Sequence, residues 1–218
     1  MLGDMLRTIS TFLLCMAFTG VQLSGQDSTV VGMNKAQLQW DASHAKELTQ
    51  REAIGVSKKL TDTEKEELTR YLMEYLRPQM KQLEINSENE LRQTARESRV
   101  AMVDLDAAGS SEVIVQMSGE NSGCGGTGNC PLLILEKTTN SYKTILRATA
   151  QTFVADEARS NGFRDVVLGL HGSATESELR VYHYRDGRYG KVACYEAAWQ
   201  ADLTGPTLKQ PIITKCQK

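Results

Sequence analysis

An internal repeat in the second half of the chain is the feature that most limits its fold. The segment GSSEVIVQMSG (109–119) aligns with GFRDVVLGLHG (162–172), and in each copy a second and a third β-type segment follow. Short apolar segments separated by turn residues are typical of antiparallel hairpins. The repeat therefore predicts two related three-strand meanders, at about 100–149 and 153–199.

The alternation of side chains in the first strand of each copy predicts which residues face the core. Because successive residues of a strand point to opposite faces, we expect Val113, Val115 and Met117 to be buried. Gln116 would then face solvent. By the same overlay, Val166 is the counterpart of Val113 and also faces the core.

Two helices are predicted before the repeat. Thr61 and Glu64 have the spacing of a capping box, and Ser87 and Glu90 repeat this spacing. The first helix carries leucines four residues apart, which gives it one apolar face. Together with the repeat, this predicts an α+β fold in which N-terminal helices pack on a mostly antiparallel β-sheet.

The start of the chain predicts export. Arg7 precedes an uncharged stretch, and Ser24 and Gly25 are small residues suited to a cleavage site. We expect cleavage near Gly25, a periplasmic or extracellular product and no stable membrane anchor. The expected organisation is a signal peptide (1–25), a linker or weakly structured segment (26–60), a helical segment (61–98) and a β-rich domain (99–218).

The balance of charge limits the kinds of partner. The chain has 25 basic and 27 acidic residues, a formal net charge of −2. This balance provides no broad positive potential for nucleic acid or for an anionic membrane. We therefore expect no nucleic-acid partner, and an envelope protein or a glycan as the ligand.

Four cysteines follow the predicted cleavage site: Cys124, Cys130, Cys194 and Cys216. An even number in an exported protein predicts disulfides, and three connectivities are open. The pairing of Cys124 with Cys130 and of Cys194 with Cys216 is the simplest. The first pair encloses the glycine-rich sequence GGTGN, an insertion between two strands of the first copy. We interpret it as a stapled hairpin loop, because zinc sites and phosphate loops need ligands or a following helix that this segment lacks.

The sequence DLDAAGSSE resembles the calcium turn D-x-D-x-D-G-x-x-D/E of FG-GAP repeats, which occur in integrin-type β-propellers and in secreted bacterial proteins. The resemblance implies that Asp104, Asp106 and Glu112 surround a calcium ion. The family has a further carboxylate where this chain has Ala108, so only weak calcium binding is expected, and no other cofactor. The same residues also suit a plain turn. In the second copy Arg159 takes the place of Asp106, which predicts a metal-independent turn.

Two repeats cannot close a propeller of at least four blades, so the resemblance is confined to the turn and the strand after it. The sequence contains neither G-x-S-x-G nor H-E-x-x-H, and its one S-x-x-K match, SHAK, lacks the companion signatures. No catalytic residue is assigned. The expected function is an exported, non-catalytic binding or structural module of the cell envelope.

Two other functions stay open. A secreted hydrolase or metal-assisted enzyme would assemble its site from scattered residues, namely Asp104, Glu112, His171 and His183. A proteinaceous enzyme inhibitor would instead use the stapled 124–130 loop. For a binding module, the expected contact surface is the late aromatic set of Tyr182, Tyr184, Tyr189, Tyr195 and Trp199.

Overall fold

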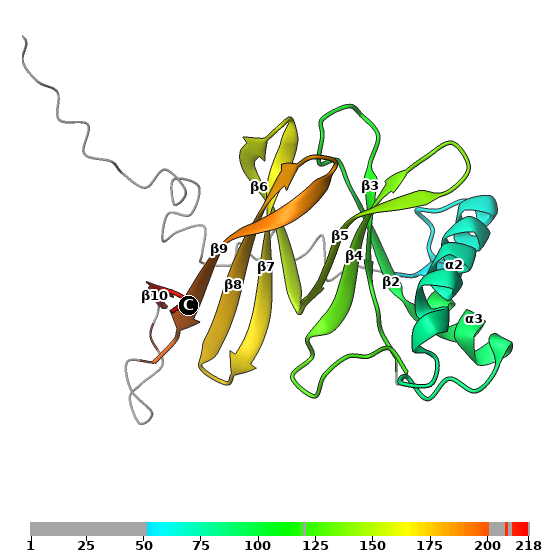
Figure 1. Ribbon diagram of the computed structural model, residues 1–218, viewed down its shortest axis with the longest axis horizontal. Helices are drawn as coiled ribbons and strands as arrows, with labels where there is room; N and C mark the ends of the chain where they lie inside the picture. Colours follow the sequence, from blue (N-terminus) through cyan, green and yellow to red (C-terminus); the bar gives the residue numbers. More distant parts are fainter. Residues whose placement is uncertain (1–51, 120, 201–207, 209–210, 218) are drawn as a thin grey trace, which may run out of the picture.

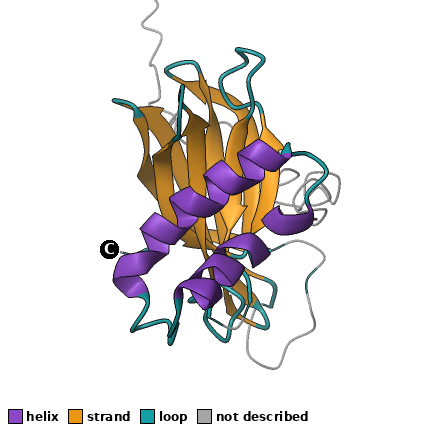
Figure 2. Ribbon diagram, turned by 90° about the vertical axis from the view of Figure 1, so that its right-hand side faces the viewer, coloured by secondary structure: helices purple, strands orange, loops and turns teal. Residues whose placement is uncertain are grey.

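Two helices and two stacked antiparallel sheets make up the described part of the chain (Figure 1). The computed structural model describes residues 52–119, 121–200, 208 and 211–217. The helices cover the outer face of one sheet, and the other face of that sheet packs on the second sheet (Figure 2). The α+β class predicted from the sequence is confirmed.

The helix layer begins where the capping residues predicted it. Helix α2 spans Asp62–Leu76 and helix α3 spans Glu88–Glu97. The hydroxyl of Thr61 accepts a hydrogen bond from the N–H of Glu64, whose carboxylate accepts one from the N–H of Thr61 at 2.9 Å. Ser87 caps α3 in the same way through its hydroxyl. A single 3-10 turn, η3, extends α2 past its end over Arg77–Gln79.

The packed structure starts before α2. Strand β1 (Glu52–Ala53) joins the edge of the first sheet, and the 3-10 turn η2 (Ile54–Val56) follows it. The Ile54 side chain is fully buried between the helices and the sheet. The end of the expected linker (26–60) is therefore part of the fold, while its beginning and the predicted signal peptide (1–25) lie outside the described residues.

Each sheet has five strands, and every pair of hydrogen-bonded strands is antiparallel and consecutive in the sequence. Sheet A contains, in order, β1, β2 (Arg99–Val103), β3 (Glu112–Gln116), β4 (Cys130–Lys137) and β5 (Tyr142–Ala150). Sheet B contains β10 (Ile212–Lys215), β9 (Arg188–Ala198), β8 (Glu176–Arg185), β7 (Phe163–Ser173) and β6 (Thr152–Ser160).

The repeat predicted three strands in each copy, and the structure has more. The residues that precede each turn, in β2 and β6, also pair with the next strand, so each copy contributes four strands. The short strands β1 and β10 then extend the outer edges. The number of strands in each copy was underestimated because the segments before the turns fall outside the part of the repeat that aligns well.

Sheet A is buried on both faces. Val113, Val115 and Met117 are buried as expected, but they lie beneath the helices and not between the sheets. The core between the sheets is formed from the opposite face of sheet A together with sheet B, and its larger members include Ile114, Leu132, Ile134, Phe153, Val166 and Leu168.

One detail of the predicted strand orientation is wrong, and the two copies of the repeat are not equivalent in the core that they face. Gln116 is buried, and its side-chain amide donates to the carbonyl of Ala150 at 2.7 Å. Val166 faces the core between the sheets, whereas Val113 faces the helices. All five residues of β3 are buried. The sequence therefore has no alternation of apolar and polar residues that would tell the helix-facing side of the strand from the side that faces sheet B.

Glu64 joins the helix layer to sheet A. Its carboxylate accepts a hydrogen bond from the ammonium group of Lys137 on β4 at 2.7 Å, in addition to those from Thr61. The hydrogen bond from Lys137, followed by those from Thr61, lowers the pKa of Glu64 to about 2. The ionised carboxylate therefore stabilises the fold above the ordinary glutamate pKa, and this contribution is lost as the pH falls toward 2.

We expect Glu64→Gln to lower the free energy of unfolding by about 1 kcal/mol at neutral pH, the typical value of a helix cap, and by much less near the pKa of Glu64. Urea unfolding at neutral and at acidic pH measures both effects. Glu74→Gln, an exposed position on the same helix, is the matched control and should change neither value. Equal stability of wild type and Glu64→Gln at neutral pH would contradict this role.

Candidate functional site

The acidic turn predicted from the sequence lies between β2 and β3. The carboxylate oxygens of Asp104, Asp106 and Glu112 all lie within 4.8 Å of one another. Asp104 is exposed, Asp106 is half-buried, and Glu112 is only 3% exposed. The structure therefore brings together the three residues that the resemblance implied.

Backbone hydrogen bonds hold these carboxylates in place. Glu112 accepts from the N–H of Leu105 at 2.7 Å, which ties the two ends of the turn together. Asp104 accepts from the N–H of Ala107 at 2.7 Å, and Asp106 accepts from the N–H two residues later at 2.8 Å. Ala107 has a φ of 60°, a left-handed conformation that these short-range hydrogen bonds support.

The electrostatics of the turn favour a proton or a cation. Burial raises the pKa of Glu112, and the neighbouring negative charges of Asp106 and Asp104 raise it further, while the hydrogen bond from Leu105 opposes the shift. A positive ion at this place would offset both the burial and the repulsion. The three carboxylates are the residues of this turn that would hold a metal ion.

Arg159 docks the acidic turn on the second sheet. Its guanidinium donates to the carbonyl of Leu105 at 3.2 Å and to that of Gly162 at 2.7 Å. The N–H of Arg164 also donates to the Leu105 carbonyl, at 2.7 Å. The second turn is a tight hairpin with positive φ at Asn161 and Gly162, as in a type I′ turn.

Among the described residues, the four residues of the enzyme alternative do not form one cluster of ligand atoms. Asp104 and Glu112 belong to the acidic turn. His183 lies 3.4 Å from Asp165, which is buried and whose other carboxylate oxygen has no partner among the described residues. His171 is near the far end of β7, about 20 Å along the strand from Asp165 at the usual rise per residue.

Both disulfides that the sequence favoured are present. Cys124 and Cys130 have a Cα–Cα distance of 4.1 Å, and Cys194 and Cys216 one of 5.4 Å. Glu178 lies next to the second pair, but the two sulfurs are bonded to each other and are not metal ligands in this state.

The stapled loop is fixed to sheet B. The side-chain amide of Asn129 donates to the carbonyl of His171 and accepts from its N–H, both at 2.8 Å. This pair of hydrogen bonds imitates strand pairing and links the loop to β7. The loop is therefore anchored to sheet B at its C-terminal end.

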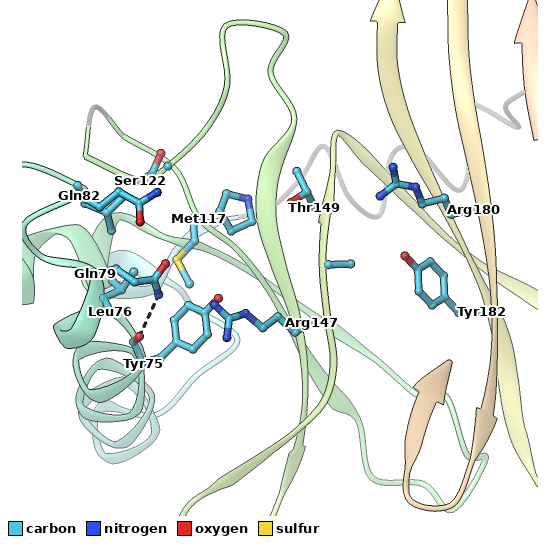
Figure 3. Close-up of a pocket in the computed structure, with 14 residues that line it drawn as sticks. Tyr75, Leu76, Gln79, Gln82, Met117, Ser122, Arg147, Thr149, Arg180 and Tyr182 are labelled. Carbon is cyan, nitrogen blue, oxygen red and sulfur yellow. Dashed lines mark hydrogen bonds between the residues drawn. The ribbon is translucent and has the colours of Figure 1, made fainter. Parts of the chain in front are cut away.

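A groove of about 560 Å³ lies where the end of α2, the segment just before the stapled loop, β5 and β8 meet (Figure 3). We call it the arginine groove, because its lining contains two arginines and no aspartate or glutamate. The lining residues are Tyr75, Leu76, Gln79, Gln82, Leu83, Met117, Ser122, Gly123, Pro131, Arg147, Ala148, Thr149, Arg180 and Tyr182.

The two arginines of the groove differ in their partners. The guanidinium of Arg180 is paired with the carboxylate of Glu178 through hydrogen bonds of 2.6 and 3.1 Å. The guanidinium of Arg147 lies over the ring of Tyr75, 4.8 Å from its centroid, as Figure 3 shows. Arg147 is exposed and makes no ion pair with a carboxylate of the described residues. It is therefore the free positive charge of the groove.

The late aromatic residues do not share one surface. Tyr182 lines the groove. Tyr184 and Tyr189 pack with Phe163 at the core between the sheets, with Tyr184 stacked on Phe163 at 3.7 Å between ring centroids. Tyr195 lies on the other face of sheet B, and Trp199 is half-buried beyond β9.

Most of the arginine groove was missed from the sequence. Its lining comes from segments that are far apart in the chain, and no local motif joins Tyr75, Arg147 and Arg180. Cation–π contacts such as that of Arg147 with Tyr75 leave no fixed spacing in a sequence.

Comparisons with known proteins do not identify a relative. No family model matches the chain, and no curated protein or solved structure shows significant similarity to it. In the part of the chain that the structure describes, no helix is both long enough and apolar enough to cross a membrane.

Proposed function

We propose that the chain is an exported, non-catalytic binding module of the cell envelope or the extracellular space, which takes its ligand in the arginine groove. The observation that carries this proposal is the groove itself, whose volume is in the range of ligand sites and whose lining mixes aromatic, amide and cationic groups. The two disulfides support an oxidising compartment.

The positions of the acid–base residues favour binding over catalysis. The carboxylate of Glu112 is used to close the acidic turn, and His183 is paired with Asp165. A general base needs a substrate within hydrogen-bond reach, and neither residue lines the arginine groove. The groove offers Arg147 to bind a ligand, and it provides shape and charge for recognition.

Arg147 favours a ligand with a carboxylate or another anionic group. The guanidinium presents several donors in a plane, and a charge-assisted hydrogen bond from it is stronger than a neutral one. Ser122 and Gly123, which directly precede the stapled loop, form part of the wall of the groove, and the Ser122 hydroxyl lies 3.0 Å from the sulfur of Cys124.

Binding by the groove is tested with Arg147→Gln, which removes the charge and keeps a polar side chain. We expect this variant to bind acidic peptides and acidic oligosaccharides about tenfold more weakly than wild type, in calorimetry or fluorescence titration. Arg70→Gln, an exposed position on α2 outside the groove, makes the same change in net charge and should bind as wild type. If wild type and both variants retain the same acidic ligands equally, the groove is not the site.

We further propose that the acidic turn binds calcium weakly, as the resemblance to FG-GAP turns implies. Support comes from the close approach of Asp104, Asp106 and Glu112 and from the raised pKa of Glu112. Three carboxylates give a site in roughly the millimolar range of extracellular calcium modules. The ion would hold the acidic turn in place and would take no part in a reaction.

The calcium proposal is tested by supplying the missing carboxylate. We expect Ala108→Asp to raise calcium affinity and to make the melting temperature increase with calcium, because a ligand that binds only the folded state stabilises it. Asn161→Asp adds the same charge to the second turn, where Arg159 already provides a cation, and should do neither. Isothermal titration calorimetry on both variants decides the matter: equal binding by the two, or none by Ala108→Asp, rejects the calcium turn.

A further inference from the structure

Among the described residues, strand β5 is the edge strand of sheet A that borders the arginine groove. In the part of the chain that the structure describes, its hydrogen-bonded neighbour is β4 alone, and its residues Arg147, Ala148 and Thr149 line the groove. Among the described residues, no backbone hydrogen bond joins these three residues to anything other than β4. An edge strand presents a row of unpaired N–H and C=O groups, which is a template for another strand.

Sheet B continues beyond the place where sheet A ends. Arg180 and Tyr182 project from β8 into the groove on the far side of β5 from Tyr75 (Figure 3). Tyr182 belongs to the core between the sheets and also lines the groove, so the inner face of sheet B borders the groove at this place. A strand placed next to β5, at the usual spacing of about 4.8 Å, would lie in this space.

We propose that the occupant of the arginine groove is an extended, acidic peptide segment of a partner protein, which pairs with β5 as a sixth strand of sheet A. This inference rests on the proposed function, since it names the ligand of the same groove. Strand addition gains affinity from main-chain hydrogen bonds and specificity from the side chains on each face.

The lining of the groove favours a peptide over a glycan. A sugar ring needs an accessible aromatic face on which to stack, but one face of Tyr75 is already covered by the guanidinium of Arg147. Tyr182 is only 8% exposed. The accessible recognition groups are instead the β5 backbone, the free charge of Arg147 and the amides of Gln79 and Gln82.

The register of β5 specifies the side chains of the peptide. Arg147 pairs with Leu133, which faces the helices, and Ala148 pairs with Leu132, which faces the core between the sheets. Directly opposed residues of neighbouring strands lie on the same face. The peptide residue opposite Arg147 therefore carries a carboxylate, and its two neighbours carry small apolar side chains directed toward Tyr182.

The probe is the peptide acetyl-Thr-Val-Glu-Val-Thr-amide. It is titrated into the chain that begins at Gln26, after the predicted signal peptide, and binding is followed by amide chemical shifts and hydrogen exchange. We expect the amide signals of Arg147–Thr149 to shift and exchange at this part of β5 to slow. Arg147→Glu should weaken binding by at least about tenfold, whereas Arg70→Glu, with the same change in charge outside the groove, should leave it unchanged. A peptide with Lys in place of Glu should also bind at least about tenfold more weakly.

A peptide with N-methyl groups on its main-chain nitrogens separates strand pairing from side-chain binding. It keeps every side chain and loses its backbone donors, so strand addition predicts that its binding is lost. If it binds as well as the parent peptide, or if an oligogalacturonate binds in an Arg147-dependent way while the peptide does not, strand addition is overturned and the proposed function stands. If no acidic probe distinguishes wild type from Arg147→Glu, both are overturned.

The remaining alternative is that the chain fills its own groove. If the peptide binds only to a chain that begins at Glu52, and not to one that begins at Gln26, the occupant is the preceding segment of this chain. That result would overturn the assignment to a partner protein.

Discussion

Phe153→Ala is expected to lower the free energy of unfolding by about 3–5 kcal/mol, the largest effect of any single substitution considered for this chain. Phe153 is 2% exposed and is among the largest fully buried side chains, and it lies in the core between the two sheets. Truncation removes its apolar contacts and leaves a cavity, because the surrounding strands are fixed by their own pairing. Since a domain of this size has a total stability of about 5–15 kcal/mol, the variant should be close to unfolding.

The measurement is urea unfolding followed by fluorescence, which gives the midpoint and the slope of the transition. Val192→Ala is the control, because Val192 is 48% exposed on β9 and its truncation should cost less than about 0.5 kcal/mol. A loss of less than about 1 kcal/mol for Phe153→Ala, within the range of an ordinary surface change, would mean that the two sheets do not share one packed core.

Loss of the Cys194–Cys216 disulfide is expected to cost about 3 kcal/mol, from the loop-closure entropy that the bond removes from the unfolded chain. The two cysteines are 22 residues apart in sequence. The bond holds the end of β10 to β9, next to the backbone hydrogen bond from the N–H of Cys216 to the carbonyl of Cys194 at 3.1 Å. The double variant Cys194→Ser with Cys216→Ser removes the bond without leaving a free thiol.

The other disulfide provides an internal comparison. Cys124 and Cys130 are 6 residues apart, so loop-closure entropy predicts a smaller loss, of about 2 kcal/mol, for the corresponding double serine variant. Thermal or urea unfolding of both variants under oxidising conditions gives the two values. If the variant without Cys194–Cys216 unfolds at the wild-type midpoint, the bond contributes nothing to stability and the loop-closure argument does not apply here.

The local signals in the sequence predicted the helices and the acidic turn. Thr61 and Ser87 mark the first turns of the two helices. A capping hydroxyl must lie next to the N–H groups that it satisfies, so the sequence pattern is confined to a few residues. Asp104, Asp106 and Glu112 come together for the same reason, since the turn that joins them is short. Features fixed by neighbouring residues were therefore accessible from sequence alone.

The features that depend on how the helices and sheets pack on one another could not be predicted from the sequence. The prediction of which side of β3 faces solvent was wrong because the helices bury one face and sheet B buries the other. The strand therefore lacks the alternation of polar and apolar residues on which such a prediction depends. The late tyrosines looked like one surface in the sequence, but the strands direct Tyr189 and Tyr195 to opposite faces of sheet B. The arginine groove depends on how β5 and β8 lie relative to each other, and no pattern of residues in the sequence predicts this.

The order of the strands has a consequence for how the chain reaches its fold. Each described strand pairs with the described strands immediately before and after it in the sequence and with no other described strand, in both sheets. A chain that is synthesised from its N-terminus can then add each strand to one that has already emerged, without waiting for a distant partner. Contacts of short sequence separation have a low loop-closure cost and favour fast folding. The meander arrangement therefore shortens the time during which unpaired apolar strands are exposed to aggregation and proteolysis.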